Sequence, residues 1–131
     1  MTDHRGIAEA YVRAYERGDF DEARSHLAEG FVMVYPGNVR YGDPEARASH
    51  TGNLYRRVRQ VFEGWTVGET LDGRPSVTAW GTLEGENLAG VAFEGVRSIE
   101  VFVFEGDRVA ELHACNDITV SRVLEVSDDD S

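Results

Sequence analysis

The segment from Val96 to Val120 constrains the fold of this chain more than any other stretch of the sequence. It reads VRSIEVFVFEGDRVAELHACNDITV, and two runs rich in β-branched residues flank its Gly106-Asp107 pair. Alternating β-branched residues on both sides of such a pair predict a β-hairpin. We therefore expect the rest of the chain to be arranged around this closing hairpin.

A two-residue loop at Gly106-Asp107 would fix the register of the hairpin. Phe104 would then face Val109, and Glu100 would face His113, and opposed residues point to the same side of a sheet. One face is predicted to carry Glu100, Phe102, Phe104, Glu111, His113, Cys115 and Asp117. The other face is predicted to carry Ile99, Val101, Val103, Ala110, Leu112 and Ala114.

The first of these faces mixes carboxylates and an imidazole with aromatic rings. Such a mixture is typical of a pocket wall, although an ordinary solvent-exposed face is the alternative. The interpretation depends on the register, because a shift of one residue would turn Glu100 away from His113.

Composition narrows the class of protein. The 131 residues suit one domain with one core, which we expect over residues 1–126, with an acidic flexible tail over 127–131. No apolar run approaches membrane length and no secretory signal is evident, so a cytoplasmic location is expected. The net charge of −11 argues against binding to nucleic acid or to anionic membrane surfaces.

The reactive side chains also exclude several chemistries. The single cysteine, Cys115, excludes an internal disulfide and a multi-cysteine zinc site, and we interpret it as a small buried hydrophobe. All 13 basic residues are arginine, so lysine Schiff-base chemistry is excluded. We expect no cofactor and no metal, because Glu111, His113 and Asp117 do not match a metal-binding motif.

Helices are predicted before the hairpin. Thr2 or Asp3 can cap a first helix whose inner face carries Ile7, Tyr11, Ala14 and Tyr15 and which ends at Gly18. A second helix is predicted from Asp19 to Gly30, with Phe20, Ala23 and Leu27 on one face. A third is predicted from Asp43-Pro44 to about Phe62, with Leu54 among its apolar residues.

Strands are predicted over 31–35, 65–71 and 76–83, and again from Ala89 into the hairpin, with a loop over 37–42, a turn over 72–75 and a bend at Gly95. Helices followed by a run of strands indicate an α+β fold, with the helices packed on one face of a curved, mainly antiparallel sheet.

Several short motifs, in this order, match a known fold family. They are Tyr11-x6-Gly18-Asp19, then Leu27-Ala28-Glu29-Gly30-Phe31 before a strand ending in Tyr35-Pro36, then Gly42, and finally the run from Glu100 to His113-x3-Asp117. From about Ile7 to Val120 the chain resembles the NTF2-like superfamily, and within it the SnoaL-like polyketide cyclases and ketosteroid isomerases. The resemblance implies a cone in which a strongly bent mixed sheet wraps three helices around a pocket, and dimers formed through the outer sheet face by Val101, Val103 and Leu112.

The resemblance also implies roles for individual residues. Tyr11 matches the tyrosine that donates a hydrogen bond to the oxyanion in the isomerases, and Glu100 matches their second, protonated carboxyl. Asp117 matches the general acid or base of SnoaL-like cyclases, and His113 lies where many of them have an inward tryptophan or histidine. Tyr35 occupies the position of the isomerase base, so steroid isomerisation by that mechanism does not fit.

The sequence therefore predicts a cofactor-free enzyme, an isomerase, cyclase or dehydratase acting on a small apolar carbonyl compound, in secondary metabolism such as antibiotic biosynthesis. The expected catalytic residues are Glu100, His113 and Asp117, and the expected substrate-binding residues are Tyr11, Tyr15, Met33, Tyr35 and Phe102.

Other interpretations of the same residues remain open. Asp117 is alternatively a cap for the strand end, and His113 a core histidine satisfied by Glu100. The chain is alternatively a non-catalytic binding or assembly domain. Epoxide-hydrolase activity is a further alternative, although Arg97 would point away from Glu100.

Overall fold

The computed structural model describes residues 2–51, 55–118 and 121–125. Its elements follow the order α1 (His4–Glu16), α2 (Phe20–Ser25), β1 (Leu27–Tyr35), β2 (Val39–Tyr41), α3 (Pro44–Thr51), β3 (Tyr55–Glu69), β4 (Pro75–Asn87), β5 (Ala92–Glu105) and β6 (Arg108–Asn116). The predicted acidic tail, residues 127–131, lies outside the described residues.

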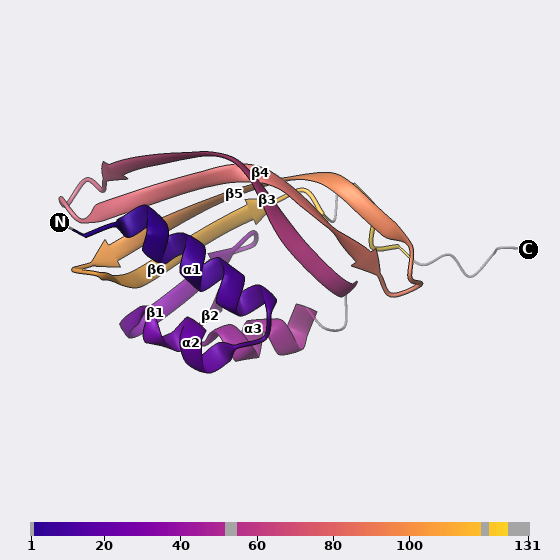
Figure 1. The fold of residues 1–131 in the computed structure, drawn as a ribbon, viewed down its shortest axis with the longest axis horizontal. Coiled ribbons are helices and arrows are strands. Elements are labelled where there is room, and N and C mark those ends of the chain that lie inside the picture. Colours follow the sequence, from indigo (N-terminus) through magenta and orange to yellow (C-terminus); the bar gives the residue numbers. More distant parts are fainter. Residues whose placement is uncertain (1, 52–54, 119–120, 126–131) are drawn as a thin grey trace, which may run out of the picture.

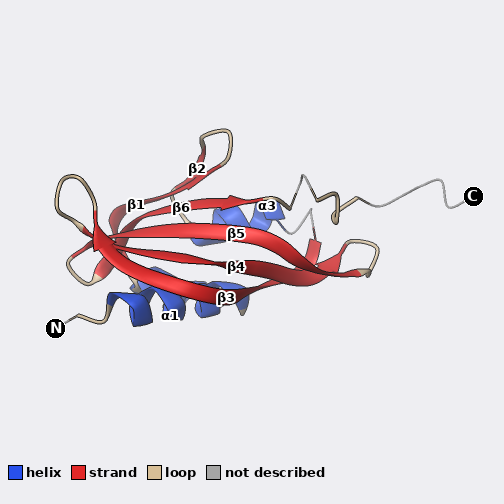
Figure 2. Cartoon of the chain, turned by 90° about the horizontal axis from the view of Figure 1, so that it is seen from above, coloured by secondary structure: helices blue, strands red, loops and turns tan. Residues whose placement is uncertain are grey.

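The strands form one curved sheet with the order β2-β1-β6-β5-β4-β3. Only the β1–β6 pair is parallel, so the sheet is mixed but mainly antiparallel. Helix α1 packs against β3 and β4, and α2 and α3 lie on the same side of the sheet (Figure 1). Viewed from above, β3 to β6 lie side by side over the helices (Figure 2). The predicted α+β fold, with three helices inside a curved sheet, is confirmed.

The first two helices begin where predicted. The Asp3 carboxylate accepts a hydrogen bond from the Gly6 N–H at 3.0 Å, and Asp19 caps α2 in the same way. The second helix ends earlier than predicted, however, at Ser25. Leu27 and Gly30 belong to β1, in which Gly30 has a φ of 81° and accompanies a shift in register against β6.

The third predicted helix is wrong beyond Thr51, because residues 55–62 are the start of β3. The sequence there alternates, so that Val58 faces the core side while the exposed Arg57 and Arg59 form ion pairs with Glu86 and Glu84 on β4. The position of Leu54 lies outside the described residues. The predicted loop over 37–42 contains the short strand β2, which pairs with β1.

The hairpin exists, but its predicted register is wrong over most of its length. Phe104 pairs with Val109 as predicted, yet the next step pairs Val103 with Glu111, so Ala110 is an extra residue in β6. Such a β-bulge shifts every later pair by one residue and reverses the faces of β6. Glu100 consequently pairs with Ala114, while His113 pairs with Val101.

Glycines allow β3 and β4 to approach closely where the sheet bends. A Cβ atom on Gly81 would collide with the carbonyl oxygen of Val61, and one on Gly85 would collide with that of Arg57. Both positions therefore need a residue without a side chain.

The core lies between the helices and the concave face of the sheet. Its largest fully buried side chains are Tyr11, Met33, Phe102, Phe104 and Leu112. A smaller cluster of Leu83, Phe93 and Val96 lies toward the far end of the sheet. Leu112, which was predicted on the outer face, is thus a core residue, and Val103 is also buried. The helices among the described residues are all too short or too polar to span a membrane.

Candidate functional site

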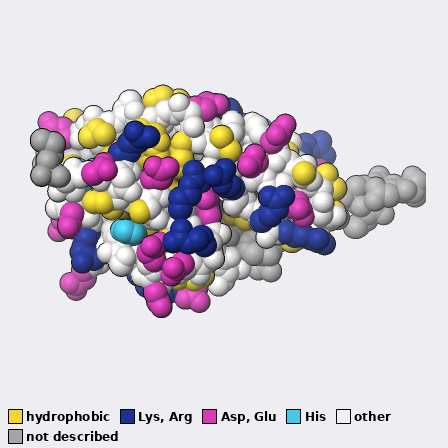
Figure 3. All heavy atoms as spheres, in the orientation of Figure 1, with side chains coloured by type: hydrophobic (Ala, Val, Ile, Leu, Met, Phe, Trp, Pro, Cys, Tyr) yellow, Lys and Arg dark blue, Asp and Glu magenta, His cyan; other side chains and the backbone are white. Residues whose placement is uncertain are grey.

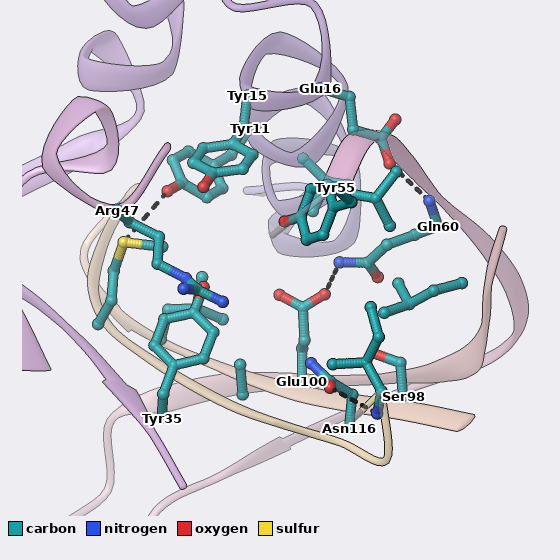
Figure 4. A pocket seen from close by; sticks show the side chains of 17 residues that line it. Tyr11, Tyr15, Glu16, Tyr35, Arg47, Tyr55, Gln60, Ser98, Glu100 and Asn116 are labelled. Atoms are coloured by element: carbon teal, nitrogen blue, oxygen red, sulfur yellow. Dashed lines mark hydrogen bonds between the residues drawn. The ribbon is translucent and has the colours of Figure 1, made fainter. Parts of the chain in front are cut away.

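A cavity opens between α1, α3 and the concave face of the sheet (Figure 4). Its volume of about 90 Å³ exceeds the roughly 10–15 Å³ that one water molecule needs. Its lining is mostly apolar and aromatic, with a few convergent polar groups, as in ligand pockets generally. The polar and aromatic lining residues are Tyr11, Tyr15, Glu16, Tyr35, Arg47, Tyr55, Gln60, Ser98, Glu100 and Asn116.

Glu100 is the buried acid of this cavity. It projects inward from the middle of β5, and only 5% of its surface is exposed. The side-chain amide of Gln60 donates a hydrogen bond to one of its carboxyl oxygens (Figure 4). Burial, and to a smaller extent the nearby Glu16, raises the pKa of Glu100 to about 8. A carboxyl group with this pKa is mostly protonated near neutral pH and keeps an ionised fraction that grows as the pH rises.

A short network fixes the partner of Glu100. The Glu16 carboxylate accepts a hydrogen bond of 2.7 Å from the backbone N–H of Gln60 and one of 2.8 Å from Arg13. Arg13 also donates to the backbone oxygen of Gln60 at 3.0 Å. These bonds join α1 to β3 at Gln60, so the amide that contacts Glu100 is held from two sides.

The buried Glu100 should make stability depend on pH. Its pKa rises from about 4.5 to about 8 on folding, so the folded chain retains a proton that the unfolded chain releases. The free energy of unfolding should therefore fall as pH rises between these two values. We expect Glu100→Gln, which cannot ionise, to gain stability relative to the unmodified chain between pH 5 and pH 8, measured by urea denaturation.

Glu111→Gln provides the control for this measurement. His113 and Arg74 lower the pKa of Glu111, so its contribution is lost as pH falls and not as pH rises. This variant should keep the decline between pH 5 and pH 8. Identical pH slopes for the unmodified chain and Glu100→Gln would contradict a raised pKa at Glu100.

Buried phenols supply hydrogen-bond donors around Glu100. The Tyr11 hydroxyl lies 3.9 Å from the Met33 sulfur, which is a weak acceptor. Burial raises the pKa of both Tyr11 and Tyr35 above the ordinary value for tyrosine. Both phenols therefore stay protonated and can donate to a ligand oxygen.

Arg47 brings a positive charge to the same cavity from α3. Its guanidinium lies 4.0 Å from the ring centroid of Tyr35 and 5.6 Å from that of Tyr41. These distances are typical of cation–π contacts. In Figure 4 the guanidinium extends over Tyr35 toward the space in front of Glu100.

Two of the three predicted catalytic residues do not line the cavity. Because of the bulge at Ala110, His113 lies on the outer face with 46% of its side chain exposed, and it bonds to Glu111 at 2.9 Å. Asp117 accepts a hydrogen bond of 2.9 Å from the backbone N–H of Arg97. It thus caps the strand end, the alternative that the sequence left open. The predicted shared face of Glu100, His113 and Asp117 is wrong.

The predicted substrate-binding residues are placed more accurately. Tyr11, Tyr15, Met33 and Tyr35 line the cavity. The prediction that Phe102 lines the binding site is wrong, because this residue is fully buried in the core beneath the cavity. The prediction that Cys115 is buried is also wrong, since this residue is exposed on the outer face.

Sequence reasoning missed Arg47, Tyr55, Gln60 and Asn116. Tyr55 and Gln60 were assigned to a helix, although alternation of Val58 and Gln60 with Arg57 and Arg59 could have indicated a strand. Asn116 was hidden by the register error. For Arg47 the sequence offers no signal beyond its place in the first turns of α3.

This arrangement can transfer a proton and stabilise a developing negative charge. Glu100 can accept or return a proton, and Tyr11, Tyr35 and Arg47 can stabilise an oxyanion. Within residues 2–51, 55–118 and 121–125, no group of three or more His, Cys, Asp or Glu side chains is placed to hold a metal ion.

Comparison with known proteins supports the fold. The chain is similar to TerC co-crystallised with polyporic acid, with 13% identity, coverage of 94% of this chain and 98% of TerC, and a TM-score of 0.77. It is similar to an NTF2-like protein of unknown function from Burkholderia pseudomallei, with 15% identity, coverage of 96% and 100%, and a TM-score of 0.77. It is also similar to a putative SnoaL-like polyketide cyclase from Jannaschia sp. CCS1, with 19% identity, coverage of 92% of both chains, and a TM-score of 0.68.

A search among curated protein sequences gave no match. The family model for the SnoaL-like domain, however, matches residues 8–112, which run from within α1 to within β6 and contain most of the cavity lining. This match covers well over half of the chain. The chain therefore belongs to the SnoaL-like domain family, within the NTF2-like superfamily.

Proposed function

We propose that this protein is a cofactor-free general acid–base enzyme, an isomerase, cyclase or dehydratase, acting on a small carbonyl compound in its central cavity. One observation carries the proposal: Glu100, with a pKa of about 8, is buried at the wall of a cavity that is otherwise lined by tyrosines and apolar side chains. A group whose pKa lies near the working pH is an effective proton-transfer catalyst.

The reaction would begin with the ionised form of Glu100. Its free carboxylate oxygen takes a proton from the carbon next to the carbonyl, and the electron pair moves onto the carbonyl oxygen. Tyr11, Tyr35 and Arg47 stabilise the resulting enolate. In an unsaturated substrate, return of the proton from Glu100 to the far carbon of the conjugated enolate completes an isomerisation. Attack of the enolate carbon on a second carbonyl forms an alkoxide, which takes the proton from Glu100 and completes a cyclisation. Loss of a hydroxyl group from the next carbon, which takes the proton from Glu100 and leaves as water, completes a dehydration.

Structural neighbours agree with a small-molecule role. TerC was crystallised with polyporic acid, and other neighbours are putative polyketide cyclases from Xanthomonas campestris and Jannaschia sp. CCS1. These similarities support a ligand-binding cavity in this chain, and the reaction itself rests on Glu100.

Hydrogen–deuterium exchange tests the first step. 2-Tetralone is a compact apolar ketone with acidic C–H groups next to its carbonyl. In deuterated buffer, the protein should accelerate loss of the corresponding proton signals, followed by nuclear magnetic resonance. Exchange at the rate of buffer alone would argue against proton abstraction.

A non-catalytic binding domain is the second candidate. It is favoured by the positions of His113 and Asp117, which remove two predicted acid–base groups from the cavity. A binding domain would take up 2-tetralone without accelerating its exchange, so the same experiment distinguishes the two functions. Epoxide opening receives no support, because Arg97 lies outside the cavity lining and pairs with Glu63 on the surface.

We also propose a homodimer formed through the outer face of the sheet. Ile99 is 52% exposed there and pairs across strands with the half-buried Trp80, beside Val101. An apolar group of this kind favours association. Ile99→Asp should convert the dimer to monomers in light scattering, whereas Leu88→Asp, at a comparably exposed position in a turn, should not. A monomeric unmodified chain would contradict the proposal.

A further inference from the structure

Arg47 is a cation at the cavity wall that has no carboxylate partner among the described residues. Among the described residues, twelve ion pairs join other arginines or a histidine to acids, and none includes Arg47. Its Nε atom is fully buried and has no hydrogen-bond partner in the described part of the chain. Its guanidinium contacts the rings of Tyr35 and Tyr41 and shares a hydrogen bond with the Tyr35 side chain.

Burying a cation without a partner raises the free energy of the folded protein, and contact with an aromatic ring offsets only part of that increase. Transfer of a charge out of water is unfavourable unless it is paired, whereas a cation–π contact contributes about 0.5–2 kcal/mol. The edge of a guanidinium that carries Nε and one terminal nitrogen matches the two oxygens of a carboxylate. The two rings hold the guanidinium in place. Because Nε is covered, the terminal nitrogens of Arg47, which lines the cavity, are the donors that a ligand carboxylate would meet (Figure 4).

From this geometry we propose that the cavity takes a carbonyl compound that carries a carboxylate, and that Arg47 binds this carboxylate as the specificity-determining residue. That this ligand is a substrate rests on the proposed function, whereas the binding of a carboxylate at Arg47 does not. With its acidic group at Arg47, the ligand would extend across the cavity toward Glu100 (Figure 4).

Further arginines lie beside the cavity, although the chain as a whole is strongly negative. A second hollow shares Tyr15, Glu16, Tyr55 and Val58 with the cavity, and its lining includes Arg17, Arg56 and Arg57 with Glu16 as its one acid. Arg17 and Arg57 each pair with one glutamate, at Glu22 and Glu86. The net charge of the whole chain is −11.

Figure 3 shows several basic side chains near the middle of the face that carries the helices, with acidic side chains among and around them. A cation beside a cavity attracts an anion toward it.

Glu100 does not oppose this binding near neutral pH. Its pKa of about 8 leaves it mostly uncharged there, so that it presents a proton instead of a negative charge. Glu16, the other acid of the lining, is already paired with Arg13 at 2.8 Å. Arg47 is therefore the uncompensated charge that a ligand would meet in the described cavity.

Benzoate and benzamide form a matched pair of probes, because they have nearly the same shape and differ in charge. We expect the unmodified protein to bind benzoate at least about tenfold more tightly than benzamide near neutral pH, measured by calorimetry. Benzoate should also shift the Nε–H signal of Arg47 in nuclear magnetic resonance spectra. Arg47→Met, which keeps the length and apolar contacts of the side chain, should bind the two probes equally.

Arg40→Met is the control, since Arg40 is exposed on β2 and does not line the cavity. It should retain the preference for benzoate. Equal affinity of the unmodified protein for both probes, or no movement of the Arg47 signal with benzoate at about 20 mM, well above a millimolar Kd, would overturn the inference. Loss of the preference in both arginine variants would also overturn it, because the effect would then be one of total charge.

This outcome is separable from the test of the proposed function. Binding of benzoate requires no proton transfer, so the anion site can be present in a protein that does not exchange 2-tetralone. Conversely, exchange that depends on Glu100 without a preference for benzoate would retain the proposed reaction and reject the role of Arg47.

Discussion

Replacing Glu100 by glutamine should lower the rate of carbonyl-directed proton exchange by about 10²–10⁴-fold, the usual contribution of a positioned general base. Glutamine keeps the size of the side chain and can still bond to Gln60, but it cannot accept a proton from carbon. The rate of the unmodified protein should rise with pH toward a plateau above about 8, as Glu100 ionises. Exchange of 2-tetralone in deuterated buffer, followed across this range, measures both effects.

His113→Ala is the matched control for this experiment. His113 was an expected catalytic residue, but it lies on the outer face of the sheet, where it bonds to Glu111. Its removal should leave the exchange rate within about twofold, because it cannot reach a molecule in the cavity. If His113→Ala abolished exchange while Glu100→Gln preserved it, the assignment of the site to the concave face would be wrong.

Phe102→Ala should destabilise the fold by about 3–5 kcal/mol, the typical cost of emptying a fully buried aromatic position. Phe102 has no exposed surface, and its ring meets that of Tyr11 edge-on with centroids 6.5 Å apart. Its removal takes away contacts between β5 and α1 beneath the cavity. Urea denaturation monitored by circular dichroism measures this loss as a lower midpoint with an unchanged slope.

Leu88→Ala gives the comparison at an exposed position. Leu88 lies in the turn after β4 and is 43% exposed, so its truncation should cost less than about 1 kcal/mol. Similar losses for the two variants would mean that the inward face of β5 does not form the core described above.

The parts of the fold that were predicted correctly have local signals. Asp3 and Asp19 cap helices through their own side chains, and the turn after Asp72 contains a glycine with a φ of 85°. The α+β class followed from the order of helical and alternating segments. These features depend on residues within a few positions of each other, which one sequence displays directly.

The errors concern features that depend on distant residues. Residues 55–62 contain apolar positions compatible with a helix, and their pairing with β4 is what makes them a strand. The bulge at Ala110 has no glycine or proline to mark it. One extra residue reverses every side chain beyond it, so Glu100, His113 and Asp117 do not share one face. Tyr11, Tyr15, Met33 and Tyr35, which lie outside the hairpin, line the cavity as expected, and their role in binding stays a prediction.

The parallel ladder between β1 and β6 has a consequence for how the chain acquires its structure. Leu27 of β1 pairs with Val109 of β6. Two strands that are separated by roughly 80 residues in the sequence must therefore come together before the sheet is continuous. Pairings between such remote segments slow folding, because the entropy of closing a long loop is lost first. During synthesis β1 would emerge from the ribosome long before its neighbour. Until β6 has been synthesised, β1 can pair only with the short β2. The apolar surfaces of helix α1 and of the β1–β2 pair would therefore stay partly exposed to solvent during this time.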